Sequence, residues 1–153
     1  RPTSLLLAIV PALVVLNGLT PYLEIKTGYG WNMYANLRTV DGDSNHLIVR
    51  RTFPLTDQQA SLVRVIRSDD AALQVYADNQ YALTWDQARR YLSRHRLVAL
   101  TYERNGHTVE LAHAQDDPAI VKPLPLWREK LQLFRSVDLT SPERCVAFWG
   151  AAG

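Results

Sequence analysis

The sequence has few of the residues that usually carry out chemistry. Cys145 is the only cysteine among 153 residues, so the chain has no internal disulfide, no CxxC redox motif and no basis for a cysteine-based zinc site. It also contains no glycine-rich phosphate loop, HExxH helix or GxSxG turn. The histidines are too widely spaced to predict a metal site: His46, His95, His107 and His113. We therefore expect no cofactor and no bound metal.

A clustered excess of positive charge is also missing. The first forty residues contain Arg1, Lys26 and Arg38 against Glu24, and the basic and acidic residues of the remaining chain balance each other. Proteins that bind nucleic acid usually show a basic patch, because the phosphate backbone dominates their affinity. We therefore expect no nucleic-acid partner.

The chain does have one long apolar stretch. Residues Thr3 to Leu23 carry no formal charge, and their centre from Leu5 to Leu16 reads LLLAIVPALVVL. A membrane-spanning helix needs about 20 apolar residues, at about 1.5 Å of rise each, to cross roughly 30 Å of hydrocarbon. We interpret residues 1–23 as a membrane helix, which places the chain at the cell membrane with the lipid bilayer as a partner. Pro11 is better tolerated beside other membrane helices. Together with a start at Arg1 rather than Met, this predicts missing upstream helices of a truncated bundle.

Two alternatives for this stretch remain open. Asn17-Gly18 and Pro21 are helix-ending signals, and a helix from Ser4 to Asn17 is short enough to be the core of a soluble binding module. A cleaved signal peptide has less support, because the residues around Asn17 offer no small-x-small cleavage site.

Residues 24–45 are rich in aromatic residues and are predicted to form an interfacial loop. Tyr29, Trp31 and Tyr34 fall close together there, and such side chains concentrate at the level of lipid headgroups. Two polar residues at its end are the candidate site residues. Arg38 is suited to binding a phosphate or carboxylate, and His46 can exchange a proton near neutral pH.

A resemblance to a known family rests on four short runs in this region: NGLTPYL (17–23), Lys26-Thr27, WNMYANLRT (31–39) and Asn45-His46-Leu47. They resemble the region after the last membrane helix of uncharacterised bacterial multi-pass proteins, which are similar to the HTTM group, the membrane fold shared with vitamin-K-dependent carboxylase. The resemblance implies that the chain is a last membrane helix followed by a C-terminal extramembrane domain. It carries over no catalytic residue, and carboxylase activity is not inferred from it.

Residues 46–150 are predicted to form a small α+β domain, because helical and strand patterns alternate there without a regular βαβ rhythm. We expect strands over 46–50 and 72–77, and a helix over 57–67 that begins with a Thr56–Gln59 capping box. A second capping box, Thr84–Gln87, predicts a helix over 85–95. Asn105-Gly106 predicts a β-hairpin over 97–112. A helix over 126–134 with Trp127, Leu131 and Phe134 inward and a last helical turn over 141–148 complete the domain.

Two further features of the sequence are open to more than one interpretation. The arginines Arg89, Arg90 and Arg94 share a helix face that is either solvated or in contact with anionic lipid. Cys145 is either a small core residue or a thiol activated near a helix start.

The sequence as a whole predicts an extramembrane C-terminal domain of a multi-pass membrane protein, with a structural or interaction role and no assigned reaction. The alternative is part of a membrane enzyme that acts on a lipid-soluble or membrane-delivered substrate, with Arg38 and His46 near its entrance. The sequence leaves open whether the protein is an enzyme.

Overall fold

A computed structural model of the chain describes residues 3–28, 37, 39–40, 42–46 and 48–140. The predicted Arg38, the predicted last helical turn over 141–148 and Cys145 lie outside the described residues, as do Tyr29, Trp31 and Tyr34 of the predicted interfacial loop. The elements follow in the order α1 (Thr3–Leu19), β1 (Thr39–Val40), β2 (Asp43–Ser44), β3 (Leu62–Ser68), α2 (Ala71–Asp78), β4 (Tyr81–Thr84), α3 (Trp85–Leu92), β5 (Leu100–Arg104), β6 (His107–Leu111), η1 (Ala114–Asp116), α4 (Pro118–Val121), α5 (Leu126–Leu131) and β7 (Val137–Asp138).

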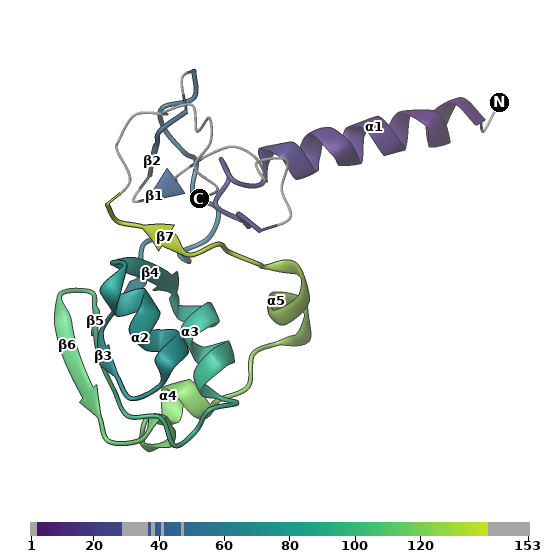
Figure 1. Ribbon diagram of the computed structural model, residues 1–153. Coiled ribbons are helices and arrows are strands. Elements are labelled where there is room, and N and C mark those ends of the chain that lie inside the picture. The colour runs from purple at the N-terminus through teal and green to yellow at the C-terminus, as the bar shows by residue number, and fades with distance from the viewer. Residues whose placement is uncertain (1–2, 29–36, 38, 41, 47, 141–153) are drawn as a thin grey trace, which may run out of the picture.

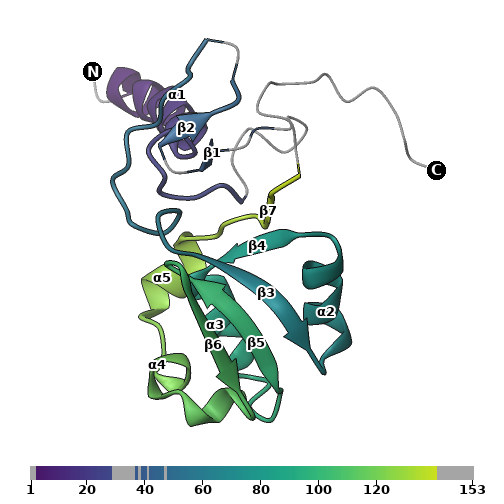
Figure 2. The ribbon, with the colours of Figure 1, turned by 90° about the vertical axis from the view of Figure 1, so that its left-hand side faces the viewer.

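The predicted α+β architecture is confirmed. Five antiparallel strands form one sheet in the order β6-β5-β3-β4-β7. Helices α2 and α3 cover one face of this sheet, and Figure 2 shows the opposite face open. A small β1–β2 pair lies outside the sheet, close to the end of α1.

Strand β3 lies at the centre of the sheet, where a helix over 57–67 was predicted. That prediction is wrong, and Thr56–Gln59 is not a capping box. Val63 and Val65 are buried while Arg64 between them is exposed, which is the period-two pattern of a strand with one covered face. Hydrogen bonding to both β4 and β5 then fixes the segment as a strand.

The strand predicted over 72–77 is instead helix α2. Asp70 is its N-cap, and the Asp70 carboxylate accepts a hydrogen bond from the Leu73 backbone N–H at 3.0 Å. Ala, Leu and Gln in AALQVYAD are good helix formers, and only Leu73 in this helix is buried. The predicted strand over 46–50 is also wrong, because the described residues there form no strand.

The capping box of α3 and the hairpin are confirmed. The Thr84 hydroxyl accepts from Gln87 N–H, and Gln87 Oε1 accepts from Thr84 N–H at 3.0 Å. Strands β5 and β6 pair from Arg104↔His107 outward, with Asn105 and Gly106 at positive φ of 52° and 74° as a type I′ turn requires.

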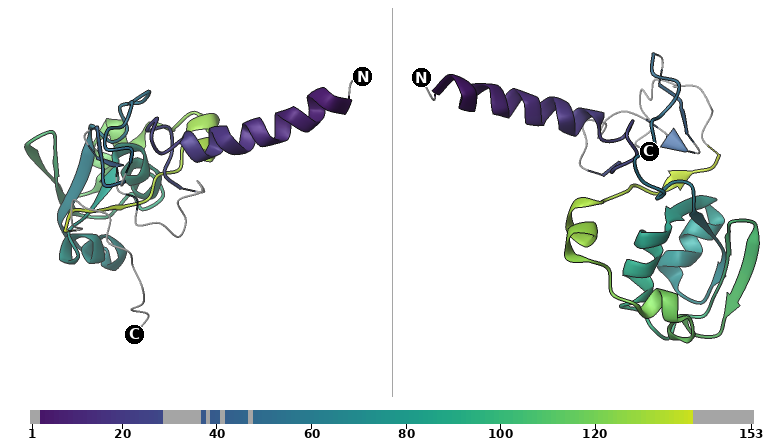
Figure 3. Two further views of the ribbon diagram at one scale, coloured as in Figure 1. Left: turned by 90° about the horizontal axis from the view of Figure 1, so that it is seen from above. Right: turned by 180° about the vertical axis from the view of Figure 1, so that it is seen from behind.

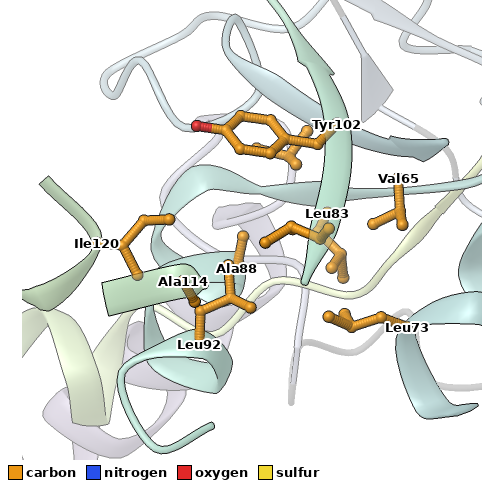
Figure 4. Close-up of a cluster of buried hydrophobic side chains, with 10 residues drawn as sticks. Val65, Leu73, Leu83, Ala88, Leu92, Tyr102, Ala114 and Ile120 are labelled. Carbon is orange, nitrogen blue, oxygen red and sulfur yellow. The ribbon is translucent and has the colours of Figure 1, made fainter. Parts of the chain in front are cut away.

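The core lies between the sheet and the helices α2, α3 and α4. Figure 4 shows Tyr102 of β5 and Leu83 of β4 extending toward Ala88 and Leu92 of α3, with Ile120 of α4 closing one side. Ile120 is completely buried and Leu92 is 2% exposed. The sheet face is therefore closed by residues from β4, α3, β5 and α4, which together extend over residues 81–121.

Helix α1 has 17 residues and includes Pro11. It projects away from the rest of the molecule, as Figures 1 and 3 show. Among the described residues, no helix combines the length and apolar character needed to cross a membrane.

Candidate functional site

The most unusual surface of the described chain belongs to α1. Every residue from Leu7 to Leu16 is exposed, including Leu7 at 75%, Val10 at 63% and Leu13 at 60%. Soluble domains expose single apolar side chains but rarely a contiguous apolar surface of this kind. The helix therefore presents an apolar surface on all sides that nothing in the described chain covers.

The segment that follows α1 is held firmly by the rest of the chain. Tyr22 and Leu23 carbonyls accept hydrogen bonds from the Phe53 and Leu55 N–H groups at 2.8 and 3.0 Å. On its other side, Thr27 and Gly28 N–H groups both donate to the Leu133 carbonyl, at 3.0 and 2.6 Å. Thr27 Oγ1 in turn accepts from Arg135 N–H at 2.7 Å. We call residues 20–28, 52–56 and 133–135 the junction, because they fix α1 to the domain.

A buried carboxylate lies in the junction. Glu24 is 2% exposed and has a positive φ of 51°. Its Oε1 accepts from the Thr52 hydroxyl at 2.6 Å, and its backbone carbonyl accepts from the Thr56 hydroxyl. Thr56, predicted to cap a helix, therefore anchors the end of the α1 segment. The sequence offered no pattern that singled out Glu24.

His46, a predicted site residue, lies beside the junction. Its ring packs edge-on against Tyr22, with ring centroids 5.6 Å apart. Its Nδ1 accepts from the Ile48 and Val49 N–H groups at 3.2 and 3.1 Å. Burial raises the pKa of the Tyr22 hydroxyl above its ordinary value. The imidazole shapes a loop through one nitrogen, which is a structural role.

The arginine face predicted on α3 is engaged with α4 and α5. Arg89 donates to the Lys122 carbonyl, and Arg90 donates to the Arg128 carbonyl at 3.5 Å. Arg94, which remains exposed, pairs with Glu129 at 3.3 Å. Arg89 and Arg90 are thus half-buried side chains that attach the α4–α5 segment to α3.

Asp86 and Arg128 link α3 to α5 through an ion pair. Arg128 Nε lies 3.0 Å from Asp86 Oδ2, and Gln58 Nε2 donates to the same oxygen at 3.0 Å. Arg89 Nη1 lies 3.8 Å from Asp86 Oδ1. Asp86 is 4% exposed, so its carboxylate is almost completely shielded from solvent. Two guanidinium groups and one amide contact it there.

Helix α5 differs from the prediction in both length and orientation. It ends at Leu131, and none of its residues is buried. Trp127 and Leu131 are 57% and 67% exposed, so their predicted inward placement is wrong. Phe134 is buried as predicted, but it lies after the helix. The reason is that Arg128 and Glu129 face α3 through their ion pairs, which turns the apolar side outward.

Within the part of the chain that the structure describes, no group of three or more histidine, cysteine or carboxylate residues is placed to hold a metal ion. Comparison of the chain with known protein families, curated proteins and solved structures finds no match. The resemblance to HTTM-type proteins therefore stays a prediction.

Proposed function

We propose that α1 anchors this protein in a membrane and that the α+β domain is an extramembrane part with a structural or interaction role. The observation that supports the proposal is the exposure of every residue from Leu7 to Leu16. Fully burying one Val, Leu or Ile side chain contributes about 1.5–3 kcal/mol. Moving the exposed apolar surface of α1 from water into an apolar environment would thus stabilise the protein by on the order of 10 kcal/mol.

The alternative of a soluble module that buries α1 in its own core has less support. A core helix of a soluble domain packs one face against other elements. From Leu7 to Leu16, α1 has no such covered face, and it carries no charged residue that would keep a second face in water. Its surroundings must therefore be apolar on all sides, as in a bilayer or among other apolar helices.

The family resemblance suggests a more specific form of the proposal, in which α1 packs beside other helices of a multi-pass protein. Pro11 agrees with this form, because neighbouring helices can satisfy the carbonyl that a proline leaves free. The proposal needs α1 to insert into apolar surroundings. It does not need the 17 described residues to cross a bilayer by themselves.

The described contacts do not favour the alternative of a membrane enzyme. His46 Nδ1 already accepts two backbone N–H groups, which leaves one ring nitrogen for any other role. A catalytic role for Arg38 and His46 remains a prediction, and loss of activity in a full-length His46→Ala protein that still folds would support it.

Two matched charge pairs test the proposal in the full chain. Val10→Lys with Val14→Lys places two charges on α1, while Ile66→Lys with Val75→Lys makes the same change at exposed positions of the domain. A lysine at the centre of a membrane helix costs about 2.5–3.5 kcal/mol. The α1 pair should therefore reduce flotation with phosphatidylcholine vesicles by more than a hundredfold, and the domain pair should not change it. Equal flotation of both pairs would overturn the proposal.

A further inference from the structure

We propose that α5 is a second membrane contact that rests on an anionic lipid surface beside the point where α1 enters the bilayer. The contact is made by the α5 ridge, which we define as Leu126, Trp127, Lys130 and Leu131. The inference rests on the proposed function, because it requires α1 to be inserted.

The α5 ridge is a continuous exposed stripe. Its four members are the only residues of this helix classed as exposed rather than half-buried, and they are spaced as two i, i+4 pairs on neighbouring rows. At 3.6 residues per turn they fall within an arc of about 140°. The two half-buried residues, Arg128 and Glu129, occupy the rest of the circumference. Arg128 pairs with Asp86 of α3, and Glu129 pairs with Arg94, which lies two residues after the end of α3. The ion pairs thus hold the helix with its apolar side out.

The position of α5 relative to α1 points to the occupant. In Figures 1 and 3, α5 lies on the side of the domain toward which α1 projects. Along the direction of the α1 axis, it lies at about the same position as the C-terminal end of α1. Hydrogen bonds of the junction link the segments that follow the two helices. Thr27 and Gly28, which follow α1, are bonded to Leu133, two residues beyond the end of α5. When α1 is inserted, α5 therefore lies at the level of the headgroups.

The chemistry of the ridge suits that level. A tryptophan ring with a polar N–H is favoured at the boundary between headgroups and acyl chains, and leucine side chains enter the acyl region. Lys130 on the ridge and the exposed Lys122, four residues before the start of α5, supply positive charge. Each such charge near an anionic surface adds attraction, so phosphatidylglycerol-type headgroups fit better than neutral ones. The arginines Arg89 and Arg90 lie beneath this surface rather than on it.

Site-directed spin labelling of the full chain in vesicles tests the inference. Three variants each carry one nitroxide, all with Cys145→Ser: Trp127→Cys on α5, Leu13→Cys on α1 and Val75→Cys on α2. All three positions are exposed in the free chain, so the label should not disturb the core. Circular dichroism checks that each labelled protein keeps its fold. The nitroxide is then probed with oxygen, which concentrates in acyl chains, and with a nickel chelate, which stays in water.

With vesicles of equal parts phosphatidylcholine and phosphatidylglycerol, we expect the label at 127 to become several-fold less accessible to nickel and more accessible to oxygen. The label at 75 should not change, and the shift at 127 should be smaller with phosphatidylcholine alone. If the label at 13 is in acyl chains while the label at 127 stays in water, the α5 contact is wrong and the proposed function stands. If both stay in water, the proposed function fails as well. Spin–spin broadening at 127 would instead show a second copy on the ridge and would overturn the lipid assignment.

Discussion

The Gly28 N–H group donates to the Leu133 carbonyl at 2.6 Å, and this bond joins the segment that leaves α1 to the segment that leaves α5. A Cβ atom added at Gly28 would lie 3.0 Å from the Leu133 carbonyl oxygen and 3.1 Å from its Cβ. The two segments thus approach as closely as a glycine allows. This contact is one of those that attach the segment after α1 to the domain.

Gly28→Ala should therefore destabilise the protein by about 1–3 kcal/mol, as overpacking of a tight site usually does. Thr27 N–H holds the Leu133 carbonyl from the same side, so the carbonyl has little freedom to move away. The measurement is urea unfolding of the full chain in detergent micelles. Gly18→Ala is the matched control, because nothing lies within 4 Å of its added Cβ. Alanine is also the better helix former. Equal effects at the two glycines would contradict the close approach.

The Asp86–Arg128 pair should be needed to hold α5 on α3. Arg128→Met leaves the Asp86 carboxylate with Arg89 and Gln58 as partners. We therefore expect the free energy of unfolding to fall by about 1–3 kcal/mol, which is less than a buried charge without any partner would cost. Lys130→Met on the same helix changes an exposed side chain and should alter stability by less than about 0.5 kcal/mol. Thermal unfolding followed by circular dichroism compares the two variants. An Arg128→Met protein as stable as Lys130→Met would show that the pair contributes nothing.

Asp70, the N-cap of α2, should make the stability of the protein depend on pH. Burial by itself would raise the pKa of the Asp70 carboxyl group. The N–H groups of Leu73 and Ala72, the Tyr91 hydroxyl and the charge of His95 together outweigh that effect and lower the pKa below its ordinary value of 3.8. A lowered pKa means that the carboxylate stabilises the folded state fully above pH 3.8 and loses this effect as the pH falls through the folded-state value.

Asp70→Asn keeps a capping oxygen but removes the charge. We expect it to be less stable than the unchanged protein by about 0.3–1 kcal/mol at neutral pH, with the difference vanishing in strong acid. Urea unfolding of both proteins, at a series of pH values from neutral to strongly acidic, measures the difference in their free energies of unfolding. In a Tyr91→Phe background, which lacks the hydroxyl donor at 2.9 Å, the difference should be smaller. A difference that is the same at every pH would mean that the charge of Asp70 contributes nothing.

The elements that the sequence predicted correctly have local causes. The Thr84–Gln87 capping box and the Asn105-Gly106 turn depend only on residues within a few positions of each other. Strand β3 is different, because Leu62, Val63 and Ile66 satisfy helical spacing while Val63 and Val65 satisfy strand alternation, so the sequence of this segment fits both structures. Pairing with β4 and β5 decides between the two, and no local pattern shows that pairing.

The same distinction applies to the candidate site. The apolar stretch before Leu23 was evident from the sequence, since a long uncharged run needs no knowledge of the fold. The outward side of α5 was not, because it follows from ion pairs between Arg128 and Asp86 and between Glu129 and Arg94, which the fold brings together. The available signal was the mixture of apolar and basic residues between Pro125 and Gln132, and the apolar residues Trp127 and Leu131 were predicted to face inward.

Both proposed membrane contacts require α1 to insert into a bilayer, and flotation of the unchanged chain measures this insertion. The chain is mixed with phosphatidylcholine vesicles in high salt, which suppresses attraction between charges and leaves the apolar contribution. We expect the chain to move with the vesicles to the top of a density gradient. A folded, monomeric chain that stays at the bottom would contradict it.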